Sequence, residues 1–304
     1  MSRVDEAWAR SASAVAAGGG IAPRIERFEP ADSCDLHHFP KEARPPASPA
    51  LGPAERWPQR AFVAPRTGEL RQRGPLSQMV DCKLVVSEQA MPIAVEQYRR
   101  IAGALHELQI EQGLKTLMVT SAAPDEGKSL TVANLALTLS ESCNRRVLLI
   151  DADLRRPQIH EIFRLPNSRG LSDFLRSDRS EAALLELSEH LSVLPAGESD
   201  QPMAALTSDR MRLLLEQFSS QFDWILVDAA PVGFMPDAQL LSRLTRAVLF
   251  VIAAHSTPHP LISRAIAELD PERIVGVVLN AVDQHDIPAA GFYQEYYARA
   301  VQAE

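Results

Sequence analysis

The chain contains 304 residues, 46% of them hydrophobic, and carries a net charge of −8 at pH 7. This length allows one large α/β domain with a tail or two domains, and the apolar content is sufficient for a substantial core. Acidic residues exceed basic ones mainly after residue 82, which disfavours nucleic acid as a partner of that region.

Cysteine usage and hydropathy exclude further classes of protein. Cys34, Cys82 and Cys143 are widely spaced and match no metal-binding or redox pattern. The longest apolar stretch, residues 247–254, is far below the roughly 18–20 residues that a membrane-spanning helix needs. No signal peptide is recognisable. We therefore expect a soluble, cytoplasmic protein.

Residues 1–84 differ in composition from the rest of the chain. Ten of the 22 prolines lie there, among many Ala, Ser and Arg residues with little periodicity. Such a segment buries too little apolar surface to fold by itself, so we expect a largely disordered N-terminal extension. A folded domain at 85–285 and a short tail at 286–304 complete the predicted organisation.

From residue 91 onward, helical patterns alternate with short apolar runs. Such alternation predicts a parallel sheet covered on both faces, which is an α/β fold. The predicted helices lie at about 91–112, 129–142, 208–221, 237–243 and 260–269, with several shorter ones within 157–188. The predicted strands lie at 116–121, 146–151, 191–195, 223–229, 246–253 and 274–280.

Residues 121–130, SAAPDEGKSL, join the first predicted strand to a helix. Gly-Lys-Ser at such a junction predicts a phosphate cradle, because the loop N–H groups and the helix N-terminus present positive partial charge. Lys128 would reach the β- and γ-phosphates, and the Ser129 hydroxyl would bind Mg²⁺. Ala122 replaces the usual first glycine. The predicted nucleotide-binding residues of this loop are Ala123, Pro124, Asp125, Glu126, Gly127, Lys128, Ser129 and Leu130.

Acidic residues follow two of the predicted strands. Asp151 and Asp153 come after one apolar run, and Asp228 ends another. Ligands bind at the carboxyl ends of strands in open α/β sheets, and residues two apart in an extended chain point the same way. Asp151 and Asp153 therefore face one predicted metal–phosphate site, unless this strand simply ends in an Asx turn that caps the next helix. Asp228 has the form of a carboxylate that holds Mg²⁺ directly or through water.

The tyrosines are unevenly distributed. Three of the four, Tyr293, Tyr296 and Tyr297, lie close together near the C-terminus, where sustained apolar periodicity is lacking. A mobile terminus is the default expectation for such a segment, and the alternative is an amphipathic end-helix that docks its aromatic rings. Tyr98 lies within the first predicted helix and is expected to be a packing residue.

Together, these motifs resemble those of the bacterial tyrosine kinases of capsule and exopolysaccharide export, over roughly residues 85–300. The matching segments are the P-loop at 122–129, an apolar-DxDxR element at 150–155 and a Walker B strand at 225–228. The segments GLSDFL, LPAG and IVGVVLNAVD also match. The DxDxR element is the most specific, because partition and cell-division ATPases of the same superfamily lack it. Those relatives also carry an extra lysine where this chain has Ala123.

The chain departs from the family's pattern in three places. Asp228 is followed by Ala-Ala-Pro instead of Thr-Pro-Pro. The ring-forming helix of the family carries Glu-x-x-Arg-x-x-Arg, and here Glu96 and Arg99 match whereas Ala102 replaces the last arginine. The C-terminal tyrosine cluster is short.

The resemblance implies an ATP- and Mg²⁺-dependent protein-tyrosine autokinase that regulates polysaccharide synthesis and export. Lys128 and the loop amides would stabilise the transferred phosphoryl group. Ser129, Asp151 and Asp228 would hold Mg²⁺, and Asp153 or Asp151, preferably Asp153, would accept the tyrosine proton. Arg155 would hold phosphate or brace these carboxylates, or only pair with one of them structurally. The resemblance also implies that Asn280 contacts the adenine base and that Tyr293, Tyr296 and Tyr297 accept phosphate.

The implied partners follow from the same resemblance. They are the cytoplasmic segment of a membrane polysaccharide co-polymerase that activates the kinase, further copies of the chain in a homo-oligomer, and a cognate tyrosine phosphatase. Such a kinase would be cytoplasmic and recruited to the inner face of the membrane. The altered sequence after Asp228 and the short tyrosine cluster leave one alternative, a nucleotide-dependent regulatory ATPase switch that binds such a partner without phosphorylating tyrosine.

Overall fold

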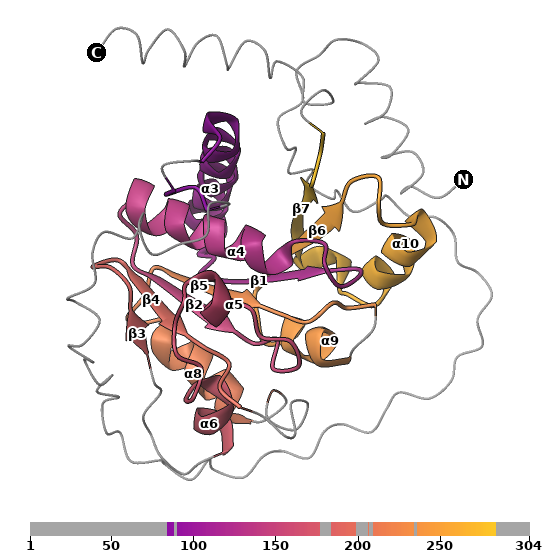
Figure 1. Ribbon diagram of the computed structural model, residues 1–304. Coiled ribbons are helices and arrows are strands. Elements are labelled where there is room, and N and C mark those ends of the chain that lie inside the picture. Colours follow the sequence, from indigo (N-terminus) through magenta and orange to yellow (C-terminus); the bar gives the residue numbers. More distant parts are fainter. Residues whose placement is uncertain are drawn as a thin grey trace, which may run out of the picture.

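The computed structural model describes residues 84–87, 90–176, 184–198, 206, 209–233 and 236–283. The predicted tail at 286–304, and all of the predicted extension except Leu84, lie outside this part of the chain. Within it, seven strands form one sheet in the order β3-β4-β2-β5-β1-β6-β7 (Figure 1). They are β1 (Thr116–Ser121), β2 (Val147–Asp151), β3 (Leu185–Glu186), β4 (Leu191–Leu194), β5 (Trp224–Asp228), β6 (Ala247–Ala253) and β7 (Ile274–Asn280).

The strand pairs are parallel except for β3 and β4, which are antiparallel. The central strands β1, β2 and β5 are buried along their whole length, as expected for strands covered on both faces. The predicted α/β fold with a mostly parallel sheet is confirmed. The helical prediction for 157–188 is wrong at its end, because Leu185 and Glu186 form the antiparallel strand β3.

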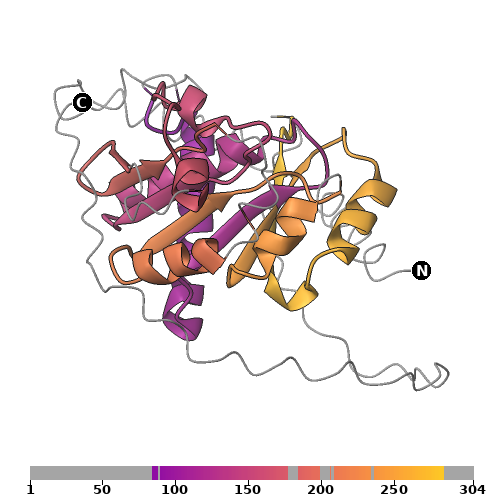
Figure 2. The same ribbon diagram turned by 90° about the horizontal axis from the view of Figure 1, so that it is seen from below.

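Helices cover both faces of the sheet (Figures 1 and 2). Side chains from α3, α4 and α5 join one apolar cluster with Leu117 and Val119 of β1. Side chains from α6, α8, α9 and α10 join a second cluster with Met118, which points to the opposite face of the same strand. The helices are α3 (Pro92–Gln112), α4 (Lys128–Leu137), α5 (Ile159–Ile162), α6 (Leu171–Arg176), α8 (Asp209–Phe218), α9 (Pro236–Ser242) and α10 (His259–Ala267).

Local sequence explains where two of these helices begin and end. Pro92 occupies the first turn of α3, where its missing N–H is not needed. Gly113 ends α3 with φ 64°, and its N–H donates to the carbonyl of Gln109. The helix predicted at 129–142 begins at Lys128 and changes after Leu137 into a π-helical turn, η2 (Thr138–Ser142). No helix in the described segments is long and apolar enough to cross a membrane.

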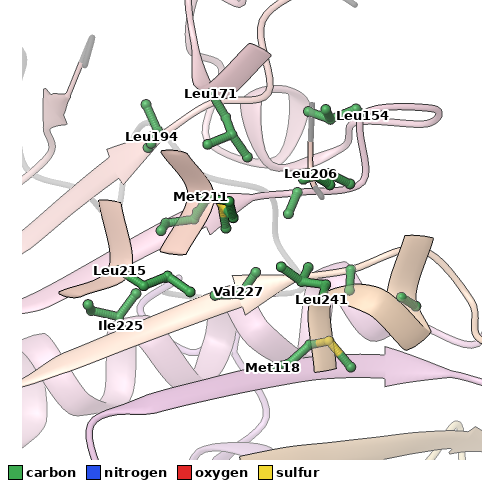
Figure 3. Close-up of a cluster of buried hydrophobic side chains, with 14 of the residues drawn as sticks. Met118, Leu154, Leu171, Leu194, Leu206, Met211, Leu215, Ile225, Val227 and Leu241 are labelled. Atoms are coloured by element: carbon green, nitrogen blue, oxygen red, sulfur yellow. The ribbon is translucent and has the colours of Figure 1, made fainter. Parts of the chain in front are cut away.

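Figure 3 shows part of the core on one face of the sheet. Met118, Ile225 and Val227 of the strands meet Met211, Leu215 and Leu241 of the helices, and all six side chains are buried. Burial of one such side chain contributes about 1.5–3 kcal/mol. This packing holds β1 and β5 against the helices and thereby helps to set the positions of the loops that follow them.

Candidate nucleotide site

The candidate site lies where β1, β2 and β5 end. Asp151 and Asp228 are paired residues in the register of β2 and β5, and Asp228 is also paired with Val119 of β1. The loop between β1 and α4 begins beyond this point. The sheet therefore brings the three predicted motifs to one edge, as the parallel strand order requires.

The backbone of the predicted P-loop is shaped by two residues with positive φ. Asp125 has φ 63° and Gly127 has φ 84°. The φ of 84° strains any residue with a Cβ atom at position 127, and that atom would also displace the Asn280 amide nitrogen, which would lie 2.0 Å away. The same amide nitrogen donates to the carbonyl of Glu126 at 2.9 Å. Asn280, at the end of β7, therefore borders the loop, and its contact with the base stays a prediction.

The side chain of Glu126 anchors the loop to a neighbouring strand. One carboxylate oxygen accepts from the N–H of Ala123 at 2.5 Å. The other accepts from the N–H of Ala253 at 3.3 Å and from the hydroxyl of Thr257. Sequence reasoning considered Glu126 only as a backbone donor, and it missed this role because the partners follow it by 127 and 131 residues. The N–H of Ala123 is already committed here, so it is not free for phosphate.

Lys128 is the centre of the site. Its ammonium group lies 2.9 Å from Asp153 Oδ2 and 3.6 Å from Asp228 Oδ1, and it donates to Ser129 Oγ at 3.1 Å. Burial lowers the pKa of Lys128, but the charges of Asp228 and Asp153 outweigh burial and raise the pKa above its usual value. The structure thus brings together four of the residues selected from the sequence.

Asp151 is held by backbone donors. Its Oδ1 accepts from the N–H of Asp153 at 3.3 Å, and its Oδ2 accepts from the N–H groups of Gln158 and Ile159 at 3.1 and 3.0 Å. This is the helix-capping geometry that the sequence left open as an alternative for this strand end. Burial and the neighbouring Asp228 raise the pKa of Asp151 well above its usual value. Asp151 therefore braces the loop that carries Asp153.

Asp228 is the acid best suited to a metal ion. Both of its carboxylate oxygens are buried and lie beyond hydrogen-bond distance of any donor among the described residues, with the Lys128 ammonium group 3.6 Å from Oδ1 and the Ser129 side chain close enough to influence its charge. Burial raises the pKa of Asp228, and the Lys128 charge and the Ser129 side chain oppose only part of that rise. Mg²⁺ prefers oxygen ligands and would satisfy these atoms. No group of three or more His, Cys, Asp or Glu in the described segments can hold a metal ion, so the ion would need phosphate oxygens as well.

Arg155 pairs with neither Asp151 nor Asp153. Its Nε donates to Asp237 Oδ2 at 2.6 Å and its Nη2 to Asp237 Oδ1 at 3.5 Å. Asp237 lies in the first turn of α9, shortly after the loop that follows Asp228. The sequence analysis did not select Asp237, because an acid in the first turn of a helix is an ordinary feature.

The remaining predicted residues lie away from this centre. Tyr98 packs against the cluster beneath α3 and α4, and burial raises its pKa although Asn134 and Thr131 hydrogen-bond to it. Glu96 and Arg99 form an ion pair within α3 at 3.3 Å, whereas Ala102 is buried. Tyr293, Tyr296 and Tyr297 lie outside the described residues.

Comparisons with known proteins agree with this geometry. Residues 117–294 match the family model described as the CobQ/CobB/MinD/ParA nucleotide binding domain. The tyrosine-protein kinase YwqD of Bacillus subtilis is 32% identical over 203 residues, which are 65% of this chain and 85% of that protein. The succinoglycan biosynthesis transport protein ExoP of Rhizobium meliloti is 30% identical over 66% of this chain, but the match covers only 26% of ExoP.

A solved structure gives the same result. The kinase domain of the Escherichia coli tyrosine kinase ETK superposes with a TM-score of 0.58 at 31% identity, covering 62% of this chain and 76% of that domain. The family model matches more than half of the chain, and the match to YwqD extends over most of that kinase. The chain belongs to the CobQ/CobB/MinD/ParA nucleotide-binding family and, within it, to the bacterial tyrosine-protein kinases.

Proposed function

We propose that this tyrosine kinase phosphorylates its own chain with ATP and acts in polysaccharide synthesis and export. One observation carries the catalytic part of the proposal: a lysine ammonium lies 2.9 Å from Asp153 and 3.6 Å from Asp228, at the ends of adjacent strands. A cation beside a carboxylate is what the transfer of a phosphoryl group to a hydroxyl needs. The polysaccharide part rests on relatives such as ExoP, which is named as a succinoglycan biosynthesis transport protein.

The chain's own groups would hold the nucleotide and its metal ion. The Ser129 hydroxyl and the Asp228 carboxylate, which accepts no hydrogen bond among the described residues, fit Mg²⁺, and the loop N–H groups from Asp125 onward fit phosphate oxygens. When bound, Mg²⁺ supplies charge neutralisation for the phosphates of ATP. Asp151, already held by three backbone N–H groups, contributes by orienting the Asp153 loop.

Asp153 is the proposed general base. The tyrosine oxygen attacks the γ-phosphorus, the bond from that phosphorus to the β–γ bridging oxygen breaks, and the phenolic proton passes to the Asp153 carboxylate. Lys128 touches Asp153 at 2.9 Å, and the N–H of Arg156 donates to the other oxygen at 3.1 Å. These two contacts fix the carboxylate, while Lys128 stabilises the charge that develops on the phosphoryl oxygens.

The proposed acceptors are Tyr293, Tyr296 and Tyr297. A tail joined to one protomer reaches the site of another at high effective concentration within an oligomer, so transfer between copies needs no strong peptide pocket. Tyr98 is partly buried and packs against the core within α3, which makes it a poor acceptor. The proposed partner is the cytoplasmic segment of a membrane polysaccharide co-polymerase, because ExoP contains the matched kinase segment as about a quarter of its length.

The experiment that tests this function is phosphotyrosine mapping by mass spectrometry after incubation of the purified chain with ATP and Mg²⁺. We expect phosphate on the three tail tyrosines, a faster rate when the partner segment is added, and no phosphotyrosine in the Asp153→Asn variant. Replacement of all three tail tyrosines with Phe should abolish phosphorylation but spare ATP hydrolysis, whereas Tyr98→Phe should change neither.

Three results would contradict parts of the proposal. ATP hydrolysis by the wild-type chain without any phosphotyrosine would favour the regulatory ATPase switch. Phosphotyrosine that persists in the triple Phe variant would remove the tail as the substrate. A rate that the partner segment leaves unchanged would remove the co-polymerase as the activator.

A further inference from the structure

The ion pair of Arg155 and Asp237 joins the two loops that carry the acids of the site. Arg155 follows β2 and is two residues beyond Asp153, whereas Asp237 begins α9 after β5 and the loop beyond Asp228. The two residues are 82 positions apart in sequence and meet at 2.6 Å. Because β2 and β5 are neighbours in the sheet, this pair fixes one loop relative to the other at the edge of the site.

The two partners differ in exposure. The Asp237 side chain is 4% exposed and the Arg155 side chain is 38% exposed. A nearly buried carboxylate needs a partner, and Arg155 is that partner. The guanidinium group is thus anchored at one edge by a rigid element and still reaches solvent at the other. Such an arrangement fixes the position of the guanidinium group and leaves it accessible to a ligand.

Arg155 keeps guanidinium N–H donors that Asp237 does not use. A guanidinium group carries five N–H donors in a fixed plane. Asp237 binds through Nε and Nη2, and within the described part of the chain no other side-chain hydrogen bond of Arg155 is recorded. Three donors, two of them on Nη1, therefore remain for a ligand. Anionic oxygens are the ligands that such a planar fork binds best.

We infer that Asp237 is a positioning residue for phosphoryl transfer: it holds Arg155 so that the free guanidinium donors bind the phosphoryl group as it passes to tyrosine. The inference rests on the proposed kinase function and adds a residue to it. Asp237 acts only through Arg155 and touches neither nucleotide nor acceptor. An arginine held in place in this way loses little side-chain freedom when it binds, which favours the transition state over the ground state.

A second ion pair on the same two strands provides a matched control. Arg146 and Asp223 lie just before β2 and β5, at the opposite edge of the sheet, and pair at 3.3 Å. They join the same strands with the same residue types, but far from the acids of the site. Asp223 is more exposed than Asp237, so the comparison is made on kcat and on binding of the phosphoryl mimic, which a purely structural tie at either edge should leave unchanged in the folded chain.

The test compares Asp237→Asn, Arg155→Gln, the double variant and Asp223→Asn in the full chain. We expect Asp237→Asn to lower the kcat of phosphotyrosine formation roughly 10- to 100-fold, as for loss of a positioned donor, with KM for ATP changed less than about twofold. The double variant should be no slower than Arg155→Gln alone. Asp237→Glu should restore part of the rate, and Asp223→Asn should keep it.

A binding measurement tests the inference without catalysis. Mg²⁺-ADP with aluminium fluoride mimics the transferred phosphoryl group, and its affinity should fall in Asp237→Asn and Arg155→Gln alike, while the affinity for Mg²⁺-ADP alone stays the same. If the wild-type chain forms no phosphotyrosine, the proposed function fails but this measurement still decides the inference. Unchanged affinity for the fluoride complex in a folded Asp237→Asn variant would overturn the inference. A further loss on adding Asp237→Asn to Arg155→Gln would also overturn it.

Discussion

The starts and the ends of the central strands β2 and β5, referred to as the amino edge and the carboxyl edge of the sheet, use aspartate and a basic partner in opposite ways. At the amino edge, Asp223 accepts from the backbone N–H and the guanidinium group of Arg146, and both side chains are partly exposed. At the carboxyl edge, Asp151 and Asp228 are fully buried, and Asp228 lies 3.6 Å from the Lys128 ammonium group, which is itself nearly buried. Both edges lie on the same strands, so their environments differ through burial and neighbouring charge alone.

The carboxyl groups respond to this difference with opposite pKa shifts. Burial tends to raise the pKa of Asp223, but the hydrogen bonds from Arg146 outweigh it, and the pKa is lowered. Burial raises the pKa of Asp228, and Lys128 offsets only part of that rise. At the amino edge the charged form of Asp223 therefore stabilises the fold, whereas at the carboxyl edge the charged form of Asp228 destabilises it. Groups that oppose folding in this way mark a functional site.

The largest effect is expected for Lys128→Met. The substitution removes the ammonium group that pairs with Asp153 and Asp228, and breaking such a buried pair costs about 3–5 kcal/mol. ATP binding should be lost or greatly weakened, and phosphotyrosine formation should fall at least about 10²-fold. Nucleotide titration and chemical denaturation of the nucleotide-free chain measure both effects.

A lysine at the other end of the same strand is the control for this variant. Lys115 directly precedes β1, and its exposed ammonium group donates to the carbonyl of Ser219 at 2.8 Å. Lys115→Met should bind ATP like the wild type. Undiminished ATP affinity in Lys128→Met would remove the phosphate-binding role of the loop and the contrast between the two edges.

A smaller effect, on the pH dependence of the free energy of unfolding, is expected for Asp228→Asn. Since burial raises the pKa of Asp228 above its reference value of 3.8, the folded chain holds a proton that the unfolded chain releases first. The free energy of unfolding should therefore fall as pH rises from 3.8 through the raised pKa. Asn carries no charge, so the variant should lose much of this pH dependence, and its stability relative to the wild type should be higher at neutral pH than in acid.

The same substitution should weaken the dependence of nucleotide binding on Mg²⁺, because an amide is a poorer ligand for a hard cation. Denaturation curves at several pH values and nucleotide titrations with and without Mg²⁺ measure the two effects. A variant that is less stable than the wild type across the whole pH range would show that Asp228 supports the fold rather than the site.

Sequence reasoning predicted the sheet and most of the site for a physical reason. Continuous apolar runs such as residues 147–150 are buried strands in nearly any context, and parallel strands bring their carboxyl ends to one edge. The meeting of Lys128, Asp153 and Asp228 follows from that rule. The short strand β3 and the π-helical turn after Leu137 were not predicted, because each depends on packing that no local pattern records.

Asp237 and the side-chain role of Glu126 were missed for a related reason. Their partners are distant in sequence, 82 residues for Arg155 and 127 for Ala253, and neither acid stands in a motif that names a partner. Asp228 was found because its strand has a recognisable form. Contacts such as that of Arg155 with Asp237 depend on how two loops fold beyond the strand ends, so the structure is needed to reveal them.

The smallest effect is expected for Asp223→Asn, at the amino edge. The carboxyl group of Asp223 has a lowered pKa, so its contribution is present above the reference value of 3.8 and is lost as pH falls through the folded pKa. A partly exposed ion pair contributes about 0.2–1 kcal/mol, and the variant should lose no more than that at neutral pH. Its stability should approach that of the wild type in acid, opposite to the behaviour of Asp228→Asn, and phosphotyrosine formation should not change. Parallel pH-dependent denaturation of the two Asn variants measures this contrast, and shifts of the same sign in both would show that the two edges do not differ as their carboxyl groups indicate.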